Sequence, residues 1–495
     1  MRSLLLLLAT SAFGALPSEP DYYAVTTYAT PPGTALEVGS IDLLPDGRLA
    51  LGTRRGEIWL ANPREGNQCD YQLFASGLHE VLGLAWKDGS LYATTRYEVT
   101  KITDQDGDGR ADVFDCFSDG WGVSGDYHEY AVGSRFDKRG DLWVTLCLTG
   151  SFSSAVPFRG WALRIGPDGK MTPTCSGIRS PGGVGFDADG EVYYCDNQGP
   201  WHGSCTLQHL VPGSFQGHPG GNQWYELAPN MGKRPVDPVP EAFQNGRKRG
   251  QQNPDGDHDR MVLERKRIKE LLPPAVYLVH GKIGNSATAI VCDESIGKFG
   301  PFNKQLFIAD QSHSNFSRVY LETINGIKQG VVFPFRSGFK SGLIGGRMTH
   351  DGVLYTGGSD RGWGARGGQP FCFEKLEWTG KVPFEMHEVH AEPDGFTITF
   401  TQPVDPQTAR TPASYSVRAF TYPYREEYGG PEVDETMLAI TSAQVAEDAK
   451  SVRLKLDRVI QGHIHELHLD GLKSTTGNPL LHSVGYYTLN EIPVK

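Results

Sequence analysis

The sequence predicts an all-β protein, a six-bladed β-propeller followed by an immunoglobulin-like β-sandwich. A unit made of an apolar strand, an Asp-Gly type turn and a second apolar strand recurs six times before residue 380. The composition, with 61 glycines, 32 prolines and 11% aromatic residues, favours many turns over long helices. From residue 381 onward this repeat stops, and segments that alternate apolar and polar residues follow, as is typical of a β-sandwich.

The chain begins with MRSLLLLLATSAFGA, which places one arginine before a leucine run and small residues. This pattern is typical of a secretory signal peptide, because the apolar run is too short to span a bilayer. We therefore expect residues 1–15 to be a signal peptide. The protein is then exported, periplasmic or extracellular, and not membrane-spanning.

Residues 16–380 carry the repeat and are predicted to form the propeller, with one four-stranded meander in each blade. A segment at 212–274 breaks the rhythm and is predicted as an insertion with a short helix between Arg260 and Leu272. The six units begin as follows: VGSIDLL at Val38, LGLAWKD at Leu82, VGSRFDK at Val132, GGVGFDA at Gly182, a looser copy at Ala287 and LIGGRMT at Leu343.

Residues 381–495 are predicted to form the sandwich. Stretches such as GFTITF, SYSVRAF, SVRLKLD and HIHELHL alternate apolar and polar side chains, which is the pattern of strands with one buried face. We interpret this domain as an immunoglobulin-like accessory module.

Composition and the missing motifs exclude several functions. A net charge of -11 argues against nucleic acid as a partner. The eight cysteines form no C-x-x-C, which excludes attached c-type haem and common zinc knuckles. Cys195 and Cys205 could close the loop between them as a disulfide, or stay as buried thiols. G-x-S-x-G, H-E-x-x-H, Walker and dinucleotide motifs are absent from the sequence.

The topology predicts which loops share one rim. Strands alternate in direction along a blade, so the connections between blades and the loops between second and third strands emerge on the same side. Function in propellers usually lies at such a rim. The loops sorted there are Ser76 to Glu80, Gly125 to Tyr130, Gly177 to Pro181, Asn197 to Ser204, Asp310 to Asn315, Phe335 to Gly342 and Ser359 to Gly368.

These loops supply candidate substrate contacts, because aromatic, amide and imidazole groups suit a sugar or another alcohol. The alternative for the aromatic and histidine members is packing within the funnel. The candidates are Trp201, His202, Gln311, His313 and Trp363.

Three short motifs resemble the soluble quinoprotein glucose/sorbosone dehydrogenase family, in its secreted planctomycete-type subgroup. They are the His128 loop, Arg-Ser-Pro at Arg179 to Pro181 and Gln-Gly-Pro at Gln198 to Pro200. The resemblance covers roughly Val38 to Trp378, and Ser180 stands where the dehydrogenases have asparagine. It implies that His128 is the base that accepts a hydroxyl proton and that Arg179 lies beside the quinone.

The cofactor that this resemblance implies is pyrroloquinoline quinone (PQQ). PQQ carries three carboxylates, so its pocket needs several cations. We expect Arg179 and Gln198 to contact it, together with the cations sorted to the same rim, which are Arg336, Lys340, Arg361 and Arg366. The alternatives are a hydrogen bond to Asp126 for His128 and a buried ion pair for Arg179.

An acidic loop predicts a second ligand. Residues 104–112 read DQDGDGRAD, which matches the D-x-D-x-D-G pattern of calcium loops, and Gly109 supplies the sharp turn. We expect a structural Ca²⁺ on the rim opposite the funnel. Its expected ligands are Asp104, Asp106, Asp108, the carbonyl of Arg110, Asp112 and Asp115.

The leading functional hypothesis is an exported PQQ-dependent dehydrogenase that oxidises a sugar or other alcohol and passes electrons to a separate acceptor. One alternative is a non-redox polysaccharide hydrolase, lyase or epimerase that uses His128 with Asp126 or Glu129. Another is a glycan-binding propeller without catalysis.

Overall fold

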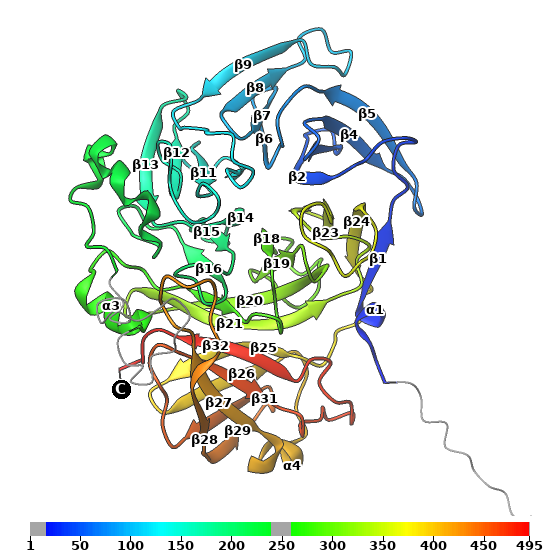
Figure 1. The fold of residues 1–495 in the computed structure, drawn as a ribbon. Helices are drawn as coiled ribbons and strands as arrows, with labels where there is room; N and C mark the ends of the chain where they lie inside the picture. Colours follow the sequence, from blue (N-terminus) through cyan, green and yellow to red (C-terminus); the bar gives the residue numbers. More distant parts are fainter. Residues whose placement is uncertain (1–15, 239–258, 495) are drawn as a thin grey trace, which may run out of the picture.

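The computed structural model describes residues 16–238 and 259–494, and the expected signal peptide (1–15) lies outside them. The described chain is nearly all β, as predicted. Six sheets surround a central axis and a further strand-rich domain lies beside the ring (Figure 1). In the described part of the chain, no helix is long and apolar enough to cross a membrane.

The first three sheets are antiparallel meanders of four consecutive strands each, and they begin where the repeat predicts. The first contains β2 (Val38–Leu43), β3 (Leu49–Thr53), β4 (Ile58–Pro63) and β5 (Cys69–Ala75). The second contains β6 (Gly83–Lys87), β7 (Ser90–Thr94), β8 (Val99–Thr103) and β9 (Val113–Ser118). The third contains β10 (Ala131–Gly133), β11 (Leu142–Leu146), β12 (Trp161–Ile165) and β13 (Met171–Ser176).

The predicted insertion falls inside the fourth sheet, between its third and fourth strands. Its described part holds short helices, and the expected helix is α3, although its first residue is Met261 and it ends at Arg267. This sheet contains β14 (Pro181–Phe186), β15 (Val192–Asp196), β16 (Cys205–His209) and β17 (Val276–Leu278), with η1 (Pro219–Leu227) and η2 (Pro229–Met231) in the insertion.

The sixth sheet is completed by the start of the chain. β1 pairs antiparallel with β24 over Tyr23↔Trp378 to Thr27↔Glu374, so an N-terminal strand forms the outer edge of the last repeat. The repeat pattern does not predict this strand, because it lies before the first repeat. The sheet contains β22 (Gly345–Met348), β23 (Val353–Ser359), β24 (Phe371–Trp378) and β1 (Tyr23–Thr27), and α1 (Glu19–Tyr22) precedes β1.

The first strands of the six sheets contact one another in a closed ring, from β2 through β6, β10, β14, β18 and β22 back to β2. Each of these strands is the end strand of its sheet, so its free edge faces the central axis. Apolar side chains between neighbouring sheets form a series of buried clusters. The arrangement is propeller-like, and it leaves a channel along the axis.

The fifth sheet extends into the C-terminal domain. Its own strands are β18 (Ala287–Cys292), β19 (Leu306–Asp310), β20 (Asn315–Ile324) and β21 (Ile327–Arg336), and β21 pairs with β32 from the end of the chain. One eight-stranded sheet therefore continues from the ring through β32 (Val484–Leu489), β31 (His463–His468), β27 (Ser416–Thr421) and β28 (Val433–Leu438).

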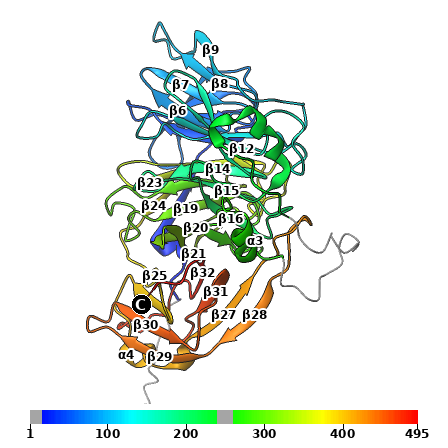
Figure 2. The same ribbon diagram turned by 90° about the vertical axis from the view of Figure 1, so that its left-hand side faces the viewer.

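A second sheet packs against that extension across a shared apolar core, which includes Phe396, Ile398, Leu454 and Tyr487. Figure 2 shows this domain below the ring. The sheet contains β25 (Met386–Glu392), β26 (Gly395–Phe400), β30 (Ser451–Leu456) and β29 (Ile440–Val445), and the short helices α4 (Pro406–Ala409) and η3 (Pro412–Ser414) lie beside it.

Candidate functional site

A cavity opens on one rim of the ring, and its walls come from the loops that the topological argument sorted there. Its volume is about 250 Å³. The rim residues that line it follow second strands or precede first strands, in agreement with the alternation of strand direction. They are Arg54, His128, Tyr130, Gly150, Ser151, Phe152, Arg179, Ser180, Asn197, Gln198, Asn285, Ser286, Gln311, Ser312 and Trp363, and Tyr428 joins them from the C-terminal domain.

His128 is partly exposed at this cavity. Its backbone N–H donates to Asp126 Oδ1 at 2.8 Å, while its Nδ1 lies 3.8 Å from the same oxygen. Burial lowers the pKa of His128; Asp126 opposes this shift, and the positive charges of Arg179 and Arg96 add to it. The imidazole is therefore neutral near pH 7 and available to accept a proton.

Aromatic rings surround His128. Its ring centroid lies 5.2 Å from that of Tyr127 and 5.9 Å from that of Trp363, which also approaches Tyr130 at 6.4 Å. Trp363 is 42% exposed, so much of its ring remains open to solvent. This wall offers the apolar faces against which the C–H faces of a sugar ring pack.

Arg179 lies in the same cavity and is held by main-chain oxygens. Its Nη1 donates to the carbonyls of Asn197 and Gln198 at 3.3 and 2.5 Å, and its Nε donates to the carbonyl of Ser151 at 3.3 Å. Gly199 is required beside it, because a Cβ there would lie 2.2 Å from the guanidinium carbon. Within the described chain Arg179 forms no ion pair with a carboxylate, and Nη2 has no hydrogen-bond partner.

The C-terminal domain supplies one wall of the cavity. The guanidinium of Arg179 lies 5.1 Å from the ring centroid of Tyr428, and Phe152 lies 6.4 Å from that ring. Main-chain hydrogen bonds hold the Tyr428 loop against the Gln-Gly-Pro loop, from Gly429 N–H to the Gly199 carbonyl and from Trp201 N–H to the Arg425 carbonyl. Sequence reasoning missed Tyr428, because no local pattern pairs these two distant loops.

The structure brings several of the predicted site residues to one cavity. His128, Arg179, Gln198, Gln311 and Trp363 all line the cavity. Gln198 donates from its side chain to the carbonyl of Gly203 at 3.0 Å, and Gln311 donates to the carbonyl of Ser359 at 3.1 Å. Both amides are thus oriented by main-chain groups beside the cavity.

The predicted contacts Trp201, His202 and His313 lie behind the cavity wall. Trp201 is 7% exposed and packs on Tyr424 of the C-terminal domain, with ring centroids 5.3 Å apart. His202 Nε2 lies 3.6 Å from Asp196 Oδ2. His313 is buried, and its backbone N–H donates to the carboxylate of Asp310. None of the three lines the cavity as the structure describes it.

The cations expected to hold PQQ do not gather in the cavity. Arg361 pairs with Glu37 at 2.9 Å and lies 3.5 Å from Glu80. Arg336 lies 3.6 Å from Glu19 and donates to the carbonyl of Tyr23. Lys340 and Arg366 are exposed outside the described cavity lining.

Arg54 is a further cavity residue that the sequence analysis missed, and its guanidinium is already engaged. It donates to the carbonyl of Arg361 at 2.9 Å, to Glu80 at 3.3 Å and to the hydroxyl of Tyr130 at 3.3 Å. Among the described residues that line the cavity, only Arg54 and Arg179 carry a positive charge. Arg179 alone retains an uncommitted nitrogen.

The acidic loop lies between β8 and β9, on the rim opposite this cavity. Asp104, Asp106 and Asp108 offer carboxylate oxygens within 4.8 Å of one another. Asp104 also accepts from the N–H groups of Gly107 and Gly109, at 2.8 and 2.9 Å, which shapes the loop. Asp112 instead accepts from Gln105 N–H, and Asp115 lies on β9 opposite Lys101, so neither joins the cluster.

All eight cysteines are free thiols in the structure. Cys195 and Cys205 are buried on the neighbouring strands β15 and β16. Of the two alternatives, the structure therefore has buried thiols and not a disulfide.

Fold and site together define a class: a propeller-like, all-β protein with an aromatic and polar cavity at one rim. Residues 64–252 match the model of a family described as "Domain of unknown function (DUF7133)". No curated protein matches the chain.

Solved structures to which the chain is similar include sugar dehydrogenases. A putative oxidoreductase (glucose dehydrogenase) from Thermus thermophilus is 19% identical, with a TM-score of 0.49 over 72% of this chain and 99% of that one. A PQQ-bound aldose sugar dehydrogenase from Streptomyces coelicolor is 15% identical, with a TM-score of 0.47 over 73% and 100%. The apo-form of the soluble aldose sugar dehydrogenase from Escherichia coli is 13% identical, with a TM-score of 0.45 over 72% and 99%.

Proposed function

We propose that this protein is an exported, sugar-directed oxidoreductase built on a six-bladed β-propeller with an immunoglobulin-like sandwich. The observation that carries the proposal is the placement of His128. A neutral imidazole lies beside the open face of Trp363 and shares one cavity with the uncommitted nitrogen of Arg179. For alcohol oxidation a protein must supply a base, a surface on which the substrate stacks and a hydrogen-bond donor.

In this mechanism the sugar packs on Trp363 and presents a hydroxyl to His128. The imidazole takes the hydroxyl proton, and hydride leaves the hydroxyl-bearing carbon for a diffusible two-electron acceptor, such as the dye of the assay below, so that the alcohol becomes a carbonyl. Nη2 of Arg179 binds an oxygen on which negative charge develops. The main-chain carbonyls around Arg179 fix its orientation, so this donor needs no rearrangement during the reaction.

PQQ, which the resemblance implies as the hydride acceptor, does not fit the residues present. Three carboxylates require several uncommitted cations, and the described cavity lining provides one, Arg179. Arg54 and Arg361 are engaged by Glu37 and Glu80, and the other expected cations lie elsewhere. No step of the mechanism is therefore routed through a quinone.

A second candidate function is glycan binding or non-redox glycan turnover at the same cavity. The missing cation set favours it, because the stacking wall and His128 serve a sugar ligand without a quinone. Asp126, 3.8 Å from His128 Nδ1, would then be its partner carboxylate, whereas Glu129 is buried and accepts from Ser124 and Thr149.

Ligand binding and turnover by three proteins separate these functions. Wild type, His128→Ala and His79→Ala are titrated with a panel of sugars by calorimetry and then assayed for dye reduction. His79 is an exposed histidine beside Tyr97 outside the cavity lining, so it is the matched control. We expect His128→Ala to lose at least 100-fold in turnover while His79→Ala keeps the wild-type rate.

Addition of PQQ and Ca²⁺ provides the second arm of this experiment. Micromolar PQQ binding with dye reduction would restore the quinone hypothesis. Sugar binding without redox turnover in any condition would favour the second candidate. If no sugar or polyol binds at millimolar concentration, both candidate functions are wrong.

We also propose that Asp104, Asp106 and Asp108 hold a structural Ca²⁺, with the Arg110 carbonyl as a further ligand. Three carboxylates and a carbonyl form the oxygen-rich ligand set that Ca²⁺ prefers. The loop lies on the rim opposite the His128 cavity, so the ion would stabilise the second sheet and take no part in turnover.

A further inference from the structure

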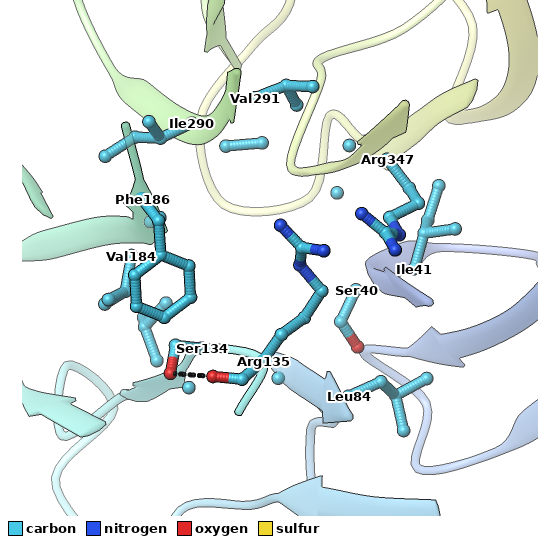
Figure 3. Close-up of a pocket in the computed structure, with 18 of the residues that line it drawn as sticks. Ser40, Ile41, Leu84, Ser134, Arg135, Val184, Phe186, Ile290, Val291 and Arg347 are labelled. Atoms are coloured by element: carbon cyan, nitrogen blue, oxygen red, sulfur yellow. Dashed lines mark hydrogen bonds between the residues drawn. The ribbon is translucent and has the colours of Figure 1, made fainter. Parts of the chain in front are cut away.

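The central channel contains a second cavity, lined by the first strands of all six sheets (Figure 3). Its volume is about 130 Å³, which is room for about four water molecules at ~30 Å³ each. Leu82, Val132, Gly182 and Ile344 line both cavities, so they form the partition between this one and the His128 cavity.

Two arginines project into the channel cavity, Arg135 after β10 and Arg347 on β22. Arg347 has a partial partner, since its Nε lies 3.2 Å from Asp42 Oδ1. Burial and the charge of Arg135 together lower the pKa of Arg347 to about 10, against the opposing charges of Asp42 and Glu294. Two like charges thus share one confined space.

Arg135 has no such partner. Within the described chain its guanidinium forms neither an ion pair nor a hydrogen bond, and only its carbonyl is engaged, by the hydroxyl of Ser134 at 2.6 Å. Figure 3 shows its side chain extending toward the middle of the cavity. Asp42 is committed to Arg347 and to the N–H of Trp86, and Glu294 is exposed at the cavity edge. An anion between the arginines would supply the missing partner.

Main-chain groups and polar side chains make up most of the exposed lining, and a set of apolar side chains adds one apolar patch beside the two guanidinium groups, against which the body of a ligand can pack. Inorganic phosphate would leave this apolar surface uncovered, whereas a carboxylate on a small hydrocarbon group would cover it. The apolar lining residues labelled in Figure 3 are Ile41, Leu84, Val184, Phe186, Ile290 and Val291.

We propose that the channel cavity binds a small organic carboxylate, with its oxygens between Arg135 and Arg347 and its apolar body against Phe186 and the neighbouring aliphatic side chains. This site is separate from the His128 cavity and does not depend on the function proposed for that cavity. The exposed edges of the inner strands provide further N–H groups toward the ligand.

Benzoate is a suitable probe, and benzyl alcohol is its uncharged counterpart of similar shape. Full-length wild type, Arg135→Ala and Arg139→Ala are titrated with both compounds and with inorganic phosphate in chloride buffer, by calorimetry. Arg139 lies four residues from Arg135 in sequence, but its side chain is exposed and pairs with Asp137, so it controls for a lost positive charge.

We expect benzoate to bind wild type and Arg139→Ala at one site, at least tenfold more tightly than phosphate or benzyl alcohol. Arg135→Ala should weaken benzoate binding at least tenfold. Equal benzoate affinity in Arg135→Ala would overturn the proposal, as would benzyl alcohol binding as well as benzoate. The second comparison uses wild type alone and decides the matter even if the variant does not fold.

Discussion

At the scale of single residues, the state of His128 decides what the cavity can do. Burial and the charges of Arg179 and Arg96 outweigh Asp126, so the folded pKa lies below the ordinary histidine value. A general base works only when deprotonated.

The pH profile of turnover tests this assignment. We expect kcat/KM to be flat at neutral pH and to fall as the pH drops through the lowered pKa of His128, below about 6.5. Asp126→Asn removes the negative charge that opposes the shift, so it should move the acidic limb to lower pH. An acidic limb that stays in place in Asp126→Asn would contradict the role of His128.

Tyr428 is the residue through which the C-terminal domain reaches the cavity. Its ring covers the guanidinium of Arg179 and lies near Phe152, and it is itself 56% exposed. We expect Tyr428→Ala to weaken sugar binding about 3- to 10-fold, because a stacking face and a cation–π contact of about 1 kcal/mol are lost.

Tyr428→Phe is the matched control, since it keeps the ring and removes only the hydroxyl. Calorimetric titration with the best sugar of the panel measures both variants. Unchanged affinity in Tyr428→Ala would mean that the C-terminal domain supports the cavity wall without contacting the ligand.

At the scale of elements, α1 is tied to the C-terminal domain through His482. This histidine lies between Glu385, at 2.6 Å, and Glu19 of α1, at 3.1 Å. Burial lowers its pKa, but the charge of Glu385 and the hydrogen bonds to Glu19 and Glu385 outweigh burial and raise the pKa to about 9.

Because the folded pKa of His482 is raised, its contribution to stability is complete below the unfolded value near 6.5 and is lost as the pH rises through about 9. We expect His482→Gln to lower the free energy of unfolding by about 3 kcal/mol at pH 6 and by much less at pH 10. Urea unfolding at both pH values measures the difference, with His79→Gln as control. A loss that is equal at both pH values would contradict the ionic origin.

The acidic loop between β8 and β9 should respond to calcium. Binding to the folded state alone stabilises by about 2.7 kcal/mol when the ion is at a hundredfold excess over its Kd. We therefore expect Ca²⁺ to raise the Tm by several degrees and a chelator to reverse the effect. Asp104→Asn should abolish this response, whereas Asp46→Asn, in the exposed turn before β3, should keep it. A calcium response that survives Asp104→Asn would place the ion elsewhere.

The sequence predicts those elements that a pattern of neighbouring residues defines. The six repeats located the starts of the six sheets, and the alternation of strand direction sorted His128, Arg179 and Trp363 to one rim. The roles of Arg361 and Trp201 could not be read in this way, because each depends on a distant partner, Glu37 and Tyr424 respectively. The same holds for β1, because its partner strand β24 lies far away in the sequence, in the last repeat.

At the scale of the whole molecule, the ring and the C-terminal domain share one sheet. β21 exchanges main-chain hydrogen bonds with β32 from Gly330↔Thr488 to Val332↔Tyr486. We expect a protein truncated after residue 380 to aggregate, because the edge of β21 and apolar residues such as Val331 and Phe333 would be exposed. Size-exclusion chromatography of the truncated and full-length proteins checks this. A monomeric, stable truncated protein would show that the ring is independent of the second domain.

The pairing of β21 with β32 also sets an order of events during synthesis. β32 follows β21 in the sequence only after the other strands of the C-terminal domain, so the edge of β21 stays unpaired until that domain has been synthesised. The cavity wall at Tyr428 likewise waits for a loop made long after the ring. Contacts of such long sequence separation form slowly. The inner ring can therefore assemble before the ligand cavity is complete.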